Sequence, residues 1–85
     1  MSSINVLFDY NFTMNTITDF KSRFNEILHL TNVRQIDLAN AANVSKQCIS
    51  DYKAGKSVPS IDTLYLICKF LDVSADYLLG LNGEI

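Results

Sequence analysis

The stretch VRQIDLANAANVSKQCISDYKAGKSVP, residues 33–59, contains two short helical patterns separated by a tight turn. Asn43 lies at the turn, and asparagine tolerates the left-handed backbone conformation better than most residues other than glycine. Ser45 follows, and serine is a good N-cap because its hydroxyl accepts a hydrogen bond from a free N–H of the next helix. The spacing therefore predicts one helix over 34–42, a reversal of the chain, and a second helix over 46–54.

Small and apolar residues in this stretch favour close contact between the two predicted helices. Val44 and Ile49 have the spacing of a hydrophobic staple, which fixes the angle at which the chain enters a helix. Ala39 is small where the two helices would meet, and Gly55 supplies a C-terminal stop. Together these features indicate a helix-turn-helix unit.

Three further helices are predicted around this unit. The first is capped by Thr16 with Asp19 and ends near Leu30. Its apolar residues recur at helical spacing: Phe20, Phe24, Ile27 and Leu28. The fourth is capped by Ser60, and the fifth runs from Ser74 to a stop at Gly80. The predicted buried stripe of the fourth helix consists of Ile61, Leu64, Ile67, Cys68 and Leu71.

The ordered set of residues along this chain resembles the Cro-type, lambda-repressor-like family of helix-turn-helix domains. The matching residues are Gln35, Leu38-Ala39, Val44-Ser45, Ile49-Ser50, Tyr52, Gly55-Lys56, Pro59-Ser60, Leu64, Ile67, Leu71-Asp72-Val73 and Tyr77-Leu78-Leu79-Gly80. The resemblance covers residues 17–81 and implies an all-α, five-helix domain that binds double-stranded DNA.

Three positions depart from the family pattern. Asn43 stands where the family commonly has a turn glycine, and Arg34 stands where a capping serine or threonine is usual. Lys53 replaces an acidic residue near the end of the helix that would enter the DNA groove, and it adds positive charge close to that face.

The first fifteen residues have a different pattern, so we expect an extended arm over 1–15 and the helix-turn-helix domain over 16–81. Within the arm, every even position from 4 to 14 is apolar, and only Leu7 breaks the polar set of odd positions between them; the apolar residues are Ile4, Val6, Phe8, Tyr10, Phe12 and Met14. A period of two predicts a half-buried strand, and a lone strand cannot satisfy its own backbone groups. Three alternatives are open for this segment. It pairs with the same strand of a second subunit, it packs on the helices as an extended arm, or it forms a disordered tail. Should the C-terminal helices make the dimer instead, the expected contacts are Tyr77, Leu78 and Leu81.

Charge is distributed unevenly along the chain. The formal net charge is −2, but residues 34–56 hold four cations and two carboxylates, which gives this segment +2 within an otherwise acidic chain. The local field, rather than the total charge, steers a polyanion toward a protein.

Other classes of function find little support in the sequence. No apolar run is long enough to cross a bilayer and no signal peptide is evident, so a cytoplasmic protein without membrane contact is expected. Cys48 and Cys68 form neither a close pair nor a metal-ligand cluster, and His29 is the single histidine. We therefore expect no metal, no cofactor, no small-molecule ligand and no catalytic residue; the protein is predicted not to be an enzyme.

Helical geometry divides the predicted helix over 46–54 into two faces. At 100° per residue, Ile49 and Tyr52 point toward the core. The opposite, polar face carries Lys46, Gln47, Ser50 and Asp51. Side chains of these types can hydrogen-bond to base edges, and the resemblance implies that these four contact bases. The alternative is that the face is merely solvated.

A second set of residues is expected to contact phosphates and so to position the helix. Gln35 lies at the N-terminus of a predicted helix, where free N–H groups and the helix dipole attract anions. The other candidates are Arg34, Lys53, Lys56 and Ser57. Arg34 could instead be an ordinary surface arginine.

The resemblance implies a sequence-specific DNA-binding transcriptional regulator, with a repressor that binds a palindromic operator as a homodimer as the leading hypothesis. The alternative is a helix-turn-helix module for protein contacts, such as an antitoxin or an antagonist of another regulator.

Overall fold

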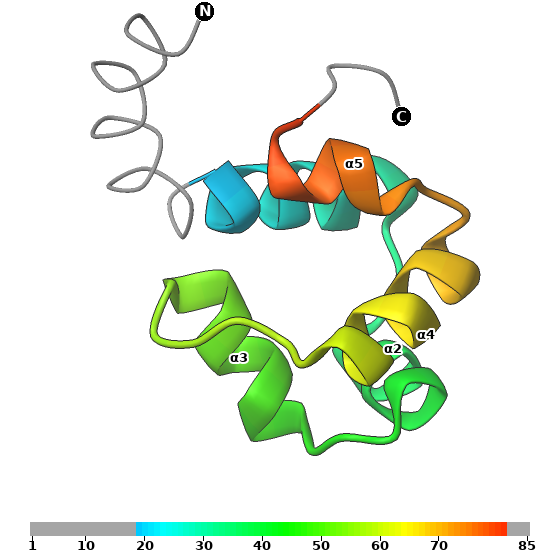
Figure 1. Cartoon of the computed structure of the whole chain (residues 1–85). Coiled ribbons are helices and arrows are strands. Elements are labelled where there is room, and N and C mark those ends of the chain that lie inside the picture. The colour runs from blue at the N-terminus through cyan, green and yellow to red at the C-terminus, as the bar shows by residue number, and fades with distance from the viewer. Residues whose placement is uncertain (1–18, 82–85) are drawn as a thin grey trace, which may run out of the picture.

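The computed structural model describes residues 19–81, and these residues form five helices and no strand. The first helix is described over 19–31. It is followed by α2 (Gln35–Ala42), α3 (Lys46–Ala54), α4 (Ile61–Leu71) and α5 (Ala75–Leu79). In Figure 1, α5 lies beside the first helix, and the short helix α2 packs against both α3 and α4. The all-α fold is confirmed; the expected N-terminal strand and the Thr16 cap lie outside the described residues.

Serine hydroxyls fix the starts of three helices, as predicted. The Oγ atoms of Ser45, Ser60 and Ser74 accept hydrogen bonds from backbone N–H groups three residues later, at 3.0–3.2 Å. Each bond satisfies one of the N–H donors that a helix leaves free at its first turn. The exception is α2, whose N-cap is Arg34 and makes no side-chain cap hydrogen bond. This helix begins one residue later than expected, at Gln35.

The chain leaves every described helix through a residue in the left-handed conformation. These residues, with φ between 56° and 80°, are Asn32, Asn43, Gly55, Asp72 and Gly80. The left-handed residue turns the chain away from the helix axis and allows the next segment to pack back on the core. Glycine adopts this conformation without the steric cost that a Cβ atom imposes, so three of the five turns carry a strained residue.

All five helices contribute buried residues to one core, and its aromatic centre joins the first helix to α3. Phe20 and Phe24 stack with ring centroids 5.2 Å apart, and the Tyr52 ring meets both edge-on at 6.4 and 6.2 Å. Ile49 is fully buried beside them. These contacts attach α3 to the first helix through one face only.

The prediction that Ile61 is buried is wrong. Ile61 is 85% exposed, because it is the first residue of α4 and precedes the turns that pack against the core. Ile67 and Leu71 are buried as predicted, and Leu64 and Cys68 are partly buried against them.

The C-terminal helix is anchored by Tyr77. Its hydroxyl donates to the Glu26 carboxylate, while the Arg23 guanidinium lies 4.9 Å from the ring centroid and donates to the Tyr77 carbonyl. Burial, together with the Glu26 hydrogen bond, raises the pKa of Tyr77. Tyr77 and Leu78 are 3% and 0% exposed, so neither is available as the dimer contact considered above; Leu81 is 61% exposed.

Asn43→Gly should stabilise the domain. The residue has a φ of 59°, which glycine adopts without strain, and we expect the free energy of unfolding to rise by about 0.5–1 kcal/mol. Urea denaturation followed by circular dichroism measures the change. The control is Asn40→Gly, an exposed site inside α2, where glycine is less favourable in a helix than asparagine and should lower stability by about 0.3 kcal/mol. Loss of stability in both variants would contradict the assignment of strain to Asn43.

Candidate nucleic-acid interface

The second helix of the unit, α3, presents a polar face on the side opposite its buried anchors. Ile49 and Tyr52 are 0% and 6% exposed, as the helical geometry predicted, and they hold the helix against the core. Lys46, Gln47 and Ser50 are exposed, and Asp51 is half-buried at the edge of the same face. The four predicted base-contacting residues therefore share one open surface on a rigidly attached helix.

Two of these residues are already paired. The Gln47 Nε2 donates to Asp51 Oδ1 at 3.0 Å, across one turn of α3. The bond leaves the Gln47 carbonyl oxygen and its second N–H free for a ligand. It also occupies one of the Asp51 oxygens, so Asp51 orients Gln47 before any ligand is present.

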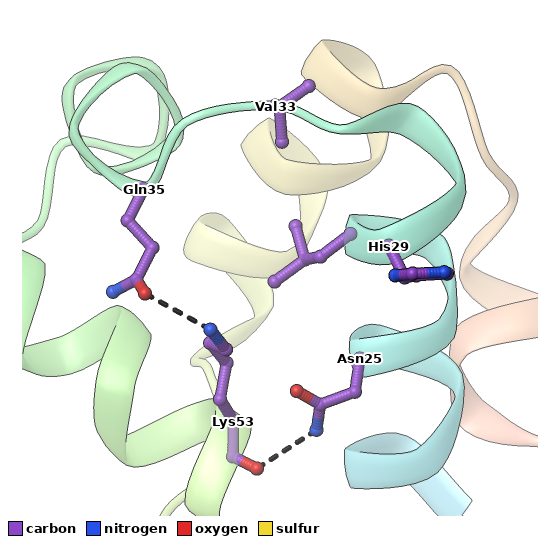
Figure 2. A pocket seen from close by; sticks show the side chains of 6 residues that line it. Asn25, His29, Val33, Gln35 and Lys53 are labelled. Carbon is purple, nitrogen blue, oxygen red and sulfur yellow. Dashed lines mark hydrogen bonds between the residues drawn. The ribbon is translucent and has the colours of Figure 1, made fainter.

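Gln35 links the start of α2 to the face of α3 (Figure 2). Its Nε2 donates to Ser50 Oγ at 3.2 Å. Its Oε1 accepts from Lys53 Nζ at 3.1 Å, which is the bond drawn from Gln35 in Figure 2. Because only the nitrogen can donate and only the oxygen can accept, the two bonds fix which way the amide points. Three of the predicted contact residues are thus joined in one network.

A cleft of about 490 Å³ lies beside this network, between the first helix and the helix-turn-helix unit. It is lined by Asn25, Leu28, His29, Val33, Gln35 and Lys53 (Figure 2). The wall from the first helix includes Asn25, which was not predicted. Its Nδ2 donates to the carbonyl oxygens of Lys53 and Lys21, at 2.9 and 2.8 Å. Asn25 therefore holds the last turn of α3 by its backbone.

Arg34 does not join the network. Its guanidinium makes two hydrogen bonds with the Asp37 carboxylate, at 2.9 and 3.1 Å, with the side chains 76% and 45% exposed. The hydrogen bond to Asp37 raises the pKa of Arg34. A surface pair of this kind contributes little to stability. Because Arg34 pairs sideways and provides no cap, the first N–H groups of α2 receive no side-chain acceptor from their N-cap residue.

Lys56 and Ser57 lie in the loop that follows α3. Both are exposed, and the backbone N–H of Lys56 donates to the Asp51 carbonyl at 2.9 Å, which holds the beginning of the loop against the helix. Within residues 19–81 neither side chain forms a hydrogen bond with the Gln35 network, so these two form a separate group beyond the end of α3.

The described residues hold neither a metal-ion cluster nor a membrane-spanning helix. They contain no group of three or more histidine, cysteine or acidic residues placed to hold a metal ion. No helix among them is long and apolar enough to cross a membrane. Cys48 and Cys68 are both free and half-buried, and burial raises the pKa of Cys68.

Comparisons with known proteins agree with this geometry. A family model described as helix-turn-helix matches residues 30–78. The HTH-type transcriptional activator BcrR of Enterococcus faecalis is 33% identical over 66 residues, which is 78% of this chain. The chain spans 31% of the length of that relative. No solved structure gives a significant match.

Lys53→Met should release the Gln35 amide while keeping most of the aliphatic stem. Without the ammonium, Gln35 Oε1 loses its donor, and the order parameter of the side-chain NH₂ group in ¹⁵N relaxation should fall. Stability should change by no more than about 1 kcal/mol, the size of one hydrogen bond. Lys56→Met is the matched control and should leave the amide unchanged. An amide that stays equally ordered in both variants would show that Lys53 does not hold it.

Proposed function

Because the chain belongs to the lambda-repressor-like, Cro-type helix-turn-helix family, we propose that it is a sequence-specific DNA-binding transcriptional regulator. The observation that carries the proposal is the two-faced helix α3, which Ile49 and Tyr52 fix to the core and whose polar face is open. A helix presented in this way fits the major groove of B-DNA. The +2 charge of residues 34–56 favours the approach of a polyanion to this side of the chain.

The polar face of α3 would read the bases. Gln47 keeps one acceptor and one donor beyond its bond to Asp51, which matches the bidentate pattern of adenine in the major groove. Lys46 suits guanine, Ser50 can serve as donor or acceptor, and Asp51 has a remaining oxygen that could accept from cytosine.

Two groups of residues would hold the DNA backbone on either side of the reading helix. At the start of α2, Gln35 can donate its second amide hydrogen to a phosphate, alongside the uncapped helix N-terminus, Lys53 and Arg34. Beyond α3, Lys56 and Ser57 would contact the next phosphates. Such contacts set the register of the helix without reading sequence.

One recognition helix contacts only a few base pairs, so we further propose a homodimer on a near-palindromic operator. The half-sites would lie one helical turn apart, about 34 Å. Repression by occupancy requires only that this complex block polymerase, whereas activation also requires a contact with polymerase. Since BcrR is named an activator, expression of a reporter gene placed behind the selected operator must be tested for both repression and activation.

Binding should depend on salt in proportion to the exposed cations. Four cations per subunit lie in residues 34–56, so a dimer could neutralise at most about eight phosphates through them. The slope of log affinity against log salt should fall between roughly −3 and −7. A mobility-shift titration on DNA upstream of the protein's own gene, or on a duplex selected from a random pool, measures it. Absence of binding even at low salt would overturn the DNA proposal and favour the protein-contact alternative.

Two alanine variants separate reading from holding. Gln47→Ala should weaken binding to the operator by about 1–3 kcal/mol and relax the preference at one base position. Lys56→Ala should weaken operator and random DNA by the same factor, because phosphates are common to both. Competition titrations with both duplexes provide the measurement. Equal proportional losses on the two duplexes for Gln47→Ala would contradict its role as a base reader.

A further inference from the structure

A second, smaller groove is lined only by apolar side chains. It holds about 90 Å³ and is formed by Phe20, Val58, Pro59, Leu64 and Leu79. These residues come from the first helix, the loop after α3, α4 and the end of α5. Val58 is 48% exposed at its rim. An apolar cavity open to water favours an apolar occupant, because water inside it finds no hydrogen-bond partners on the walls.

The chain itself supplies a candidate occupant. Residues 1–18 lie outside the described part, and they join it at Asp19, immediately before Phe20, which lines the groove. The even positions from Ile4 to Met14 are all apolar, so an extended segment there would present one apolar face. Phe12 and Met14 are the members of that face nearest to the groove along the chain.

We propose that the apolar face of residues 4–14 covers this groove within the same chain, with Phe12 or Met14 inserted into it. Each residue of the tether can span roughly 3.3 Å, so the few residues between Met14 and Asp19 are enough to reach the rim. The short tether gives the segment a high effective concentration at its own groove, which favours it over the segment of a second copy. The volume of the groove suits one large side chain, and the other apolar residues would lie along Val58 and its surroundings.

The groove also has a consequence for DNA binding, a step that rests on the proposed function. Val58 and Pro59, which form one wall, follow directly after Lys56 and Ser57 in the same loop. A side chain inserted against this wall would restrict the loop that is proposed to hold phosphates beyond α3. The N-terminal segment would therefore strengthen binding to any DNA sequence without reading bases.

Occupancy can be tested on the full-length protein without DNA. Nuclear Overhauser contacts are expected from the Phe12 ring or the Met14 methyl to the methyl groups of Val58, Leu64 and Leu79. A mixed sample of labelled and unlabelled chains, recorded with isotope filters, separates contacts within one chain from contacts between chains. Absence of these contacts, or their presence only between chains, would overturn the proposal.

A mutant cycle gives an independent measurement. Val58→Asp and the double substitution Phe12→Ser with Met14→Ser should each lower the melting temperature by roughly 4–8 °C. Combined, they should lower it by little more than either alone, because both remove the same contact. Asn11→Ser with Thr13→Ser is the control on the opposite face of the segment, and Leu30→Asp is the control at an exposed apolar site elsewhere. The effect of Asn11→Ser with Thr13→Ser should add to that of Val58→Asp, and the effect of Leu30→Asp should add to that of Phe12→Ser with Met14→Ser. Equally additive effects for Val58→Asp and Phe12→Ser with Met14→Ser would refute the contact.

The effect of the N-terminal segment on DNA affinity is measured in a separate experiment. Phe12→Ser with Met14→Ser should weaken binding to operator and random duplexes by the same factor, between three- and tenfold. Unchanged affinity would overturn the role in holding the loop. Failure of the unmodified protein to bind any duplex would overturn the proposed function and leave the docking within the chain standing on the contacts and the mutant cycle.

Discussion

The reversal of the chain at Asn43 is the constraint on which the rest of the fold depends. With Asn43 left-handed, its N–H donates to the Asn40 carbonyl at 3.2 Å and the N–H of Val44 donates to the Ala39 carbonyl at 3.0 Å. These bonds close the end of α2, and Ser45 immediately caps α3. The turn thereby sets the angle between the two helices, and only at that angle can Ile49 and Tyr52 reach the core while Gln47 and Ser50 stay outside.

The start of α2 differs from the starts of α3, α4 and α5, which are capped by serine side chains. Ser45, Ser60 and Ser74 satisfy a backbone donor at the beginning of their helices, whereas Arg34 pairs with Asp37 and provides no cap. The local stability given up there leaves a helix N-terminus with donors available for an anion. In the proposed complex this is where a phosphate would lie, so the departure from the family's usual capping residue is compatible with DNA binding.

Much of this architecture could be predicted from local sequence, because its signals are local. The serine caps, the glycine stops at Gly55 and Gly80, and the inward direction of Ile49 and Tyr52 all follow from residue type and helical periodicity over a few positions. Ile61 was misplaced because periodicity assigns a residue to a face but does not say where along the helix the neighbouring helices begin. The bonds of Asn25 and Gln35 to Lys53 could not be predicted, since they join residues 28 and 18 positions apart and depend on the packing angles of three helices.

The bridge made by Gln35 has a thermodynamic consequence for recognition. A long polar side chain that becomes ordered on binding loses conformational entropy, at a cost of about 0.5–1.5 kcal/mol in binding free energy. The Gln35 amide is already hydrogen-bonded to both Ser50 and Lys53 in the free protein, so this part of the interface is preorganised. A phosphate that binds there would meet a donor that needs no further ordering, whereas the exposed Lys56 must lose its freedom at the moment of contact.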